Sequence, residues 1–195
     1  MYELYVLGEL MDQPLHGYLL HYILQVSLGP VRSISWGALY PLIRRLEGMG
    51  WIQTHADENA GRGRQRKVYK ITPSGQARFL ELMLEPVVYN TDYPDLFHIK
   101  LSNFGHVSPQ QQRAILQQYR GYVQFLHDHA HMNERKVAQE CNIPEQERPH
   151  ILRVLHHRIT LLRADLDWVD GEIERLSEQV SASTDLSFLT DTQEE

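Results

Sequence analysis

The sequence has little cysteine, no long apolar run and no overall positive charge, and each shortage excludes a class of protein. Cys141 is the only cysteine in 195 residues, so no internal disulfide can form and a reducing compartment is expected. No apolar run approaches the length of a membrane span, and the first residues lack the basic and apolar stretches of a signal peptide. We therefore predict a cytoplasmic protein with no membrane segment.

The charge is distributed unevenly along the chain, although the net charge of −6 would by itself disfavour nucleic acid. Residues 1–85 contain nine Lys/Arg and eight Asp/Glu, whereas residues 86–195 contain ten and seventeen. Between Arg44 and Arg78 the sequence contains eight basic side chains and only three acidic ones. Because phosphate binding depends on local charge, this basic region makes double-stranded DNA a candidate partner.

Catalytic and metal-binding patterns are also missing. The sequence shows no nucleophile paired with a base, no paired carboxylates and no phosphate loop, so we predict neither an enzyme nor a bound cofactor. His127 and His131 are one helical turn apart, a spacing that can hold a metal, but no cysteine or acidic cluster with metal spacing accompanies them. We predict no metal site and a polar helix face there.

The stretch from Ser35 to Thr72 organises the chain. Ser35 is expected to cap a helix with its hydroxyl, and apolar side chains then recur at helical spacing at Leu39, Leu42, Ile43 and Leu46. Two β-rich segments, 51–54 and 68–72, flank a tip rich in glycine and arginine at 60–67. A helix, a strand, a basic tip and a second strand form the layout of a winged helix-turn-helix.

In this layout the helix enters the major groove and the tip reaches phosphates or the minor groove. The predicted DNA-contacting residues lie in the helix or the tip: Ser35, Trp36, Tyr40, Arg44, Arg62, Gly63, Arg64, Arg66 and Lys67. Tyr18 begins an earlier helix. It is either a contact to the DNA backbone or a core tyrosine beneath the recognition helix.

The remaining chain reads as helices, which are expected at 2–11, 16–28, 76–85, 108–141 and 147–180, with a turn at 72–75. The predicted fold is mainly α with a small β-hairpin wing. It comprises a winged helix-turn-helix domain at 1–86, a linker or junction at 87–107, a helical dimerisation domain at 108–180 and a disordered tail at 181–195.

An apolar seam runs along the last long helix. Its members alternate steps of four and three: Leu155, Ile159, Leu162, Leu166, Val169, Ile173 and Leu176. Such a seam must be buried, so we predict a homodimer that presents two recognition helices to a palindromic operator. A second apolar set, Ile151, Val154, Leu161 and Trp168, widens the seam and indicates more than one packing neighbour.

Two motifs, LYPLIRRLEGMGWI and then GRGRQRKVYKITPSG, resemble the PadR-like transcriptional regulators, and the upstream run LGELMDQPLHGYLL is similar to the first two helices of that family. The resemblance covers about the first half of the chain. Trp36 differs from the family, which usually has a smaller or polar residue there. The resemblance implies a repressor that phenolic acids such as p-coumarate release from DNA.

The junction at 87–107 is the predicted place for such an effector, because it combines aromatic rings with polar groups. The candidate residues are Tyr89, Tyr93, Phe97, His98, Lys100 and Phe104. The alternative is that these rings only pack a hinge. Two further readings stay open: a regulator controlled by protein contacts, and an adaptor whose winged helix binds protein.

Overall fold

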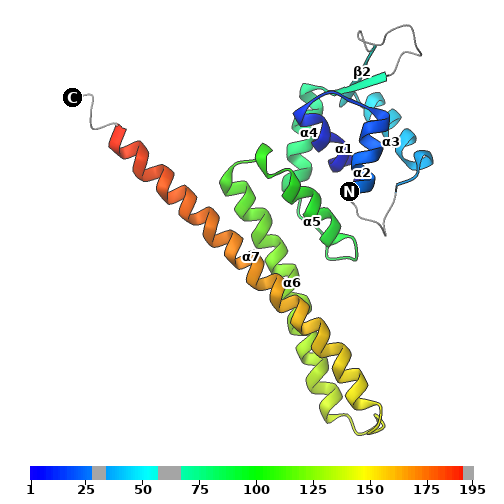
Figure 1. Ribbon diagram of the computed structural model, residues 1–195, viewed down its shortest axis with the longest axis vertical. Helices are drawn as coiled ribbons and strands as arrows, with labels where there is room; N and C mark the ends of the chain where they lie inside the picture. Colours follow the sequence, from blue (N-terminus) through cyan, green and yellow to red (C-terminus); the bar gives the residue numbers. More distant parts are fainter. Residues whose placement is uncertain (28–33, 57–66, 191–195) are drawn as a thin grey trace. The chain divides into compact units, whose positions relative to one another are not determined.

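The computed structural model describes residues 1–27, 34–56 and 67–190, and the chain divides into two compact units, Met1–Ser108 and Pro109–Glu195 (Figure 1). The first unit contains α1 (Tyr2–Asp12), β1 (Leu15–His16), α2 (Gly17–Ser27), α3 (Trp36–Gly48), β2 (Ile52–Ala56), β3 (Lys67–Ile71), α4 (Pro73–Leu84), α5 (Tyr93–Ser102) and the 3₁₀ turn η1 (Phe104–His106). The second unit contains α6 (Pro109–Gln139) and α7 (Arg148–Thr190). The predicted fold class, mainly α with a small β-hairpin, is confirmed.

The sheet of the first unit has three antiparallel strands in the order β1-β3-β2. Ile52 pairs with Ile71, as expected for the hairpin, and Leu15 pairs with Tyr69 on the other edge of β3. The sequence did not predict β1, because two residues are too few to show an alternating pattern. This short strand leads directly into α2 and so ties the start of that helix to the sheet.

Helices α1, α3 and α4 each bury apolar side chains in the core of the first unit. α1 is buried around most of its circumference, whereas α3 buries only the stripe Leu39, Ile43 and Leu46 and α4 buries Phe79 and Met83. Fully burying a side chain of this size stabilises the fold by roughly 1.5–3 kcal/mol. Three of the four residues of the predicted apolar stripe thus form the inner face of α3, whereas the fourth, Leu42, is half-buried.

The segment 72–75 was predicted to be a separate turn, but in the structure it is the start of α4. Thr72 is the N-cap: its Oγ1 accepts from the Gly75 amide at 3.1 Å. Pro73 follows at the first helical position, where its missing N–H costs no helical hydrogen bond. The Thr72 hydroxyl and the Ser74 hydroxyl both donate to the Gly50 carbonyl, at 2.7 and 2.9 Å. α4 is thereby fixed to the chain just before β2.

Ser35 occupies the predicted N-cap position of α3, but the prediction that its hydroxyl caps the helix is wrong. Its extended backbone, φ −76° and ψ 155°, suits the position, yet the exposed side chain makes no capping hydrogen bond. The Ser35 carbonyl instead accepts from the amides of Ala38 and Leu39 at 3.0 Å. Residue type indicates where a helix begins but does not fix the rotamer.

The stretch 87–107 forms α5 and η1 and belongs to the first compact unit. Asn103 is buried and donates from Nδ2 to the Ile99 carbonyl at 2.8 Å. Its amide oxygen would lie 2.4 Å from a Cβ added at Gly8, so α1 has room for Asn103 only because residue 8 is glycine. This contact holds the segment against α1.

The second unit is an antiparallel hairpin of α6 and α7 (Figure 1). Polar contacts join the helices: the Tyr119 hydroxyl donates to Asp165 at 2.6 Å, and Arg120 binds both carboxylate oxygens of Asp170 at 2.5 and 3.1 Å. α7 continues through 181–190, where the sequence suggested a disordered tail. None of the helices, over the residues described, is long and apolar enough to span a membrane.

The heptad seam of α7 lies largely inside this hairpin. Four of its seven side chains are buried within the single chain: Leu155, Leu166, Val169 and Leu176. The second apolar set is more exposed, with Val154, Leu161 and Trp168 at 53%, 58% and 42%. α6 therefore supplies an apolar neighbour for the seam, whose direct part in a dimer stays a prediction.

Candidate nucleic-acid interface

The outer face of α3 carries Trp36, Tyr40 and Arg44, each four residues after the last, and lies beside the buried stripe. Ser35, Tyr40 and Arg44 are exposed and Trp36 is half-buried. The structure thus brings four of the predicted DNA-contacting residues to one end and one face of a single helix. The major groove of B-DNA admits an α-helix, so this face can meet the base edges.

Trp36 is the centre of an aromatic stack formed with Tyr18, His21 and Tyr40. Its ring centroid lies 3.9 Å from that of His21 with an interplanar angle of 11°, 5.3 Å from Tyr40 and 6.3 Å from Tyr18. Tyr18 is 74% exposed, so its ring is at the surface and not in the core. Sequence reasoning missed His21, because the stack joins α2 to α3 and no local pattern signals that contact.

His21 is buried and anchors the stack. Its Nε2 lies 2.8 Å from the Ile34 carbonyl, and with the proton on that nitrogen the ring donates a hydrogen bond to the chain just before α3. The imidazole plane is therefore fixed by the backbone on one side and covered by the Trp36 indole on the other. The indole, in turn, lies against a ring that is held in place.

The two adjacent arginines of α3 have different surroundings. Arg45 Nη2 lies 3.0 Å from Glu3 Oε2, and Arg78 Nε of α4 lies 3.0 Å from the other oxygen of the same carboxylate. Glu3 therefore links the start of α1 to both α3 and α4. Arg44 points to the exposed outer face instead, which makes it the arginine of α3 available to DNA.

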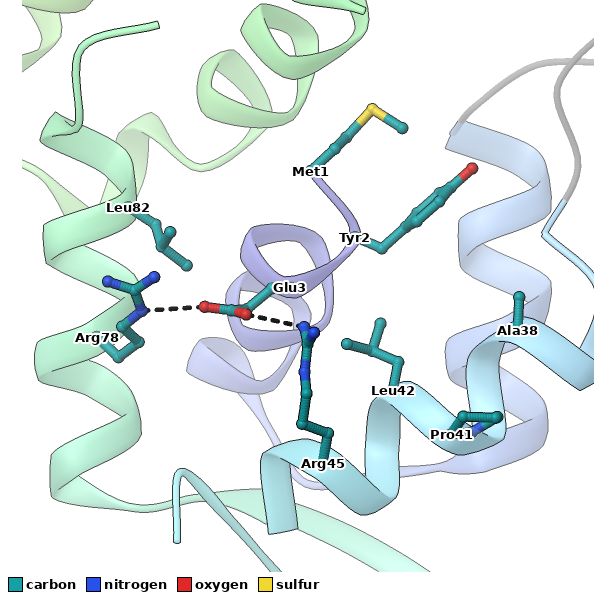
Figure 2. Close-up of a pocket in the computed structure, with 9 residues that line it drawn as sticks. All are labelled: Met1, Tyr2, Glu3, Ala38, Pro41, Leu42, Arg45, Arg78 and Leu82. Carbon is teal, nitrogen blue, oxygen red and sulfur yellow. Dashed lines mark hydrogen bonds and ion pairs between the residues drawn. The ribbon is translucent and has the colours of Figure 1, made fainter. Parts of the chain in front are cut away.

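A cavity of about 520 Å³ lies on the side of α3 that carries Arg45. Figure 2 shows Arg45 and Arg78 approaching Glu3 from two helices, with Tyr2, Leu42 and Leu82 around them. The Glu3 carboxylate already binds both guanidinium groups, so the polar centre of this cavity is satisfied within the protein. We interpret the cavity as the site of a structural bridge.

The hairpin contributes exposed cations beside α3. Lys67 and Lys70 are exposed on β3, which pairs with β2 from Ile52 to Ala56. Burial raises the pKa of Tyr69 between them, and Glu47 raises it further, so this phenol stays neutral at ordinary pH. The predicted contacts Arg62, Gly63, Arg64 and Arg66 lie outside the described residues.

The histidines of the second unit form polar pairs. The rings of His127 and His131 lie edge to face, 4.6 Å between centroids, and Glu134 accepts from His131 at 3.0 Å and from His156 at 2.6 Å. The hydrogen bond from His131, followed by that from His156, lowers the pKa of Glu134. Within the described ranges, no group of three or more His, Cys, Asp or Glu could hold a metal ion.

The residues expected to bind an effector are divided between the core and the surface of the first unit. Tyr93, Phe97 and Lys100 are buried, and Lys100 Nζ donates to the Glu85 carbonyl at 2.9 Å. Burial lowers the pKa of Lys100 to about 8. Tyr89 is exposed and stacks on Tyr93 with 5.9 Å between centroids. His98 is exposed and Phe104 is half-buried.

Comparison with known proteins gives one family and several structures of low similarity. Residues 6–81 match the model of the transcriptional regulator PadR-like family. None of the curated proteins searched matches the sequence.

Among solved structures, Bacillus subtilis PadR in complex with operator DNA is 17% identical, with a TM-score of 0.41, over 90% of this chain and 98% of that one. The same protein in complex with p-coumaric acid is 18% identical, with a TM-score of 0.39 and the same coverage. The circadian clock associated protein Pex from Anabaena is 28% identical, with a TM-score of 0.36, over 40% of this chain and 68% of that one. The match over residues 6–81 places the winged-helix part of this chain in the transcriptional regulator PadR-like family.

Proposed function

We propose that this protein is a sequence-specific regulator of transcription that binds double-stranded DNA through α3 and the β2–β3 hairpin. The observation that carries the proposal is the outer face of α3, where Trp36, Tyr40 and Arg44 project away from a fully apolar inner stripe. A helix that is buried on one face and aromatic and basic on the other suits the major groove. The PadR-like family match over the same residues supports a role in transcription.

Salt-dependent binding to duplex DNA tests this proposal, with DNA from upstream of the protein's own gene as the probe. We expect the logarithm of the binding constant to fall linearly with the logarithm of salt concentration, because bound phosphates release counterions. Arg44→Gln should make that slope less steep by about one unit if Arg44 meets a phosphate. Arg45→Gln, which changes the neighbouring arginine bound to Glu3, should leave the slope unchanged.

The opposite result would favour the adaptor reading. If duplex DNA does not bind at low salt, the winged helix binds another partner, and a protein becomes the candidate. If DNA binds but both arginine variants keep the wild-type slope, Arg44 is not a phosphate contact, and the hairpin must supply the charge.

The proposal includes a homodimer on a palindromic operator. In a single hairpin the seam residues Leu166 and Val169 are already buried, whereas Val154, Leu161 and Trp168 follow one another at intervals of seven and remain exposed. Steps of seven place side chains along one narrow line of a helix, as in helix pairing. We infer that this exposed line meets its own copy across a two-fold axis, while the seam supports it from inside the hairpin.

Release of DNA by a small aromatic acid enters the proposal from the family resemblance of the sequence. Tyr89 offers an exposed ring and His98 an exposed imidazole, whereas Lys100 is bound to the Glu85 carbonyl. Calorimetry with p-coumarate, repeated with Tyr89→Ala and His98→Ala, tests the placement. Absence of both binding heat and DNA release would instead indicate control by protein contacts.

A further inference from the structure

The aromatic stack offers a chemistry that general DNA binding does not require. Tyr18, Trp36 and Tyr40 present rings at the N-terminal end of α3, and two of them are well exposed. The hydroxyls of the two tyrosines can donate to phosphates, but the faces of the three rings carry no group that binds one. An exposed aromatic surface on the face that enters the groove therefore needs an apolar feature of DNA to meet.

The major groove has one apolar feature on its base edges, the C5-methyl group of thymine. Guanine, cytosine and adenine present hydrogen-bond acceptors and amino groups, which are read by side chains such as Arg, Lys, Asn or Gln. Among the described residues of the outer face of α3, Arg44 alone has such a group, and it lies two turns beyond Trp36. The first two turns of the helix thus carry rings where a polar reader would stand.

The aromatic stack is also held rigidly enough to distinguish one DNA sequence from another. Trp36 lies against His21 with 3.9 Å between centroids, and His21 is fixed to the Ile34 carbonyl at 2.8 Å. Because the Trp36 ring is already held on its inner side, it loses little conformational entropy when DNA covers its outer side. The energy of the contact with DNA is therefore not offset by the cost of ordering the ring. His21 thereby acts as a positioning residue for Trp36.

We propose that the aromatic stack reads thymine methyl groups in the major groove, with Trp36 as the specificity-determining residue and Tyr40 beside it. The inference rests on the proposed DNA-binding function and names what that function recognises. It separates the two parts of α3: Trp36 and Tyr40 select the sequence, and Arg44 supplies charge.

The test begins with selection of binding sites from a random duplex pool by the full-length protein. We expect thymine at fixed positions of the selected sites. Each such thymine is then replaced by deoxyuridine, which removes only the methyl group. The dissociation constant should rise by about fourfold for each contacted methyl, because this factor corresponds to the free energy of burying one such carbon group.

Variants assign the effect to the stack. Trp36→Ala and Tyr40→Ala should bring the ratio of uracil to thymine dissociation constants toward one, whereas Trp36→Phe, which keeps a ring, should retain part of the ratio. Tyr22→Ala changes another exposed tyrosine of α2 and should leave the ratio unchanged. Circular dichroism confirms that each variant is folded, and Tyr40→Ala, at an exposed position, serves if Trp36→Ala does not fold.

Two failures are distinguishable. If wild-type protein binds the selected duplex but tolerates uracil at every position, or if the alanine variants keep the thymine preference, the inference is wrong and the DNA-binding function stands. If the protein selects no duplex at all, the DNA-binding function fails and the inference fails with it. The aromatic stack would then be a surface for a protein partner.

Discussion

Gly75 lets the first turn of α4 approach the chain before β2 more closely than any other residue would allow. A Cβ at this position would lie 2.0 Å from the Trp51 carbonyl oxygen and 2.9 Å from its carbon, both backbone atoms that cannot move aside. Gly75→Ala should therefore lower the free energy of unfolding by roughly 1–3 kcal/mol, the usual cost of overpacking. Urea denaturation followed by circular dichroism measures the change.

The matched control is Gly48→Ala at the end of α3, where an added Cβ meets no described atom within 4 Å. Alanine is favoured over glycine in a helix by about 0.5–1 kcal/mol, so this variant should be neutral or slightly stabilising. Equal stability of the two variants would show that α4 can shift away from Trp51 at little cost.

Lys100 gives the first unit a dependence on alkaline pH. Burial lowers the pKa of this lysine from 10.5 to about 8 in the folded protein, whereas the unfolded chain keeps the ordinary value. Between these two values the unfolded chain binds more protons than the folded one, so stability rises with pH across that window. Below pH 8 the folded protein carries the full cost of a buried charge.

Lys100→Met keeps most of the side-chain volume and removes the charge. The stability of wild type relative to this variant should increase from pH 8 to pH 10, and the variant should be at least as stable as wild type at pH 7. Urea denaturation of both proteins across this range gives the difference, in which other titrating groups cancel. Parallel curves would mean that Lys100 keeps its ordinary pKa.

At the level of elements, local patterns predicted what depends on one segment and missed what depends on two. The apolar stripe of α3 was predictable because a helix repeats every 3.6 residues: Leu39, Ile43 and Leu46 are buried, and Leu42 is half-buried. β1 was not predictable, because Leu15 becomes a strand residue only by pairing with Tyr69. The same holds for the candidate site. The motif indicated Trp36 and Tyr40 of α3, but the ring that supports Trp36 is His21 of α2.

Glu3 joins three helices through one carboxylate, and the strength of its two ion pairs should differ. Arg45 is largely exposed, so a double-mutant cycle between Glu3→Gln and Arg45→Gln should give a coupling of about 0.2–1 kcal/mol. Arg78 is less exposed and also lies 5.3 Å from the Trp51 ring centroid, so Arg78→Gln should destabilise the fold more than Arg45→Gln does. Equal losses, measured by thermal unfolding, would show that the further contacts of Arg78, with Trp51 and with Glu81, add nothing.

At the scale of the whole molecule, the uneven charge agrees with the proposal that the winged helix binds DNA and the helical hairpin forms the dimer. The residues up to 85 have a small positive balance, with nine Lys/Arg and eight Asp/Glu, and residues 86–195 are acidic, with ten and seventeen. In the proposed function, an acidic helical hairpin would repel the DNA backbone and leave the winged helix as the part of the chain that binds DNA. The hairpin is then available to hold a second copy.

The dimer proposal predicts opposite outcomes for two leucines of α7. Leu161 is 58% exposed and belongs to the exposed line of Val154, Leu161 and Trp168, whereas Leu166 is 8% exposed inside the hairpin. Leu161→Asp should leave the hairpin folded but dissociate the dimer, because burying an unpaired carboxylate in an interface costs several kcal/mol. Leu166→Asp should unfold the hairpin itself. Light scattering and circular dichroism separate a folded monomer from an unfolded chain, and affinity for a palindromic duplex should fall in both. If Leu161→Asp remains a dimer, the exposed line is not the interface, and the two copies must exchange or share their seams.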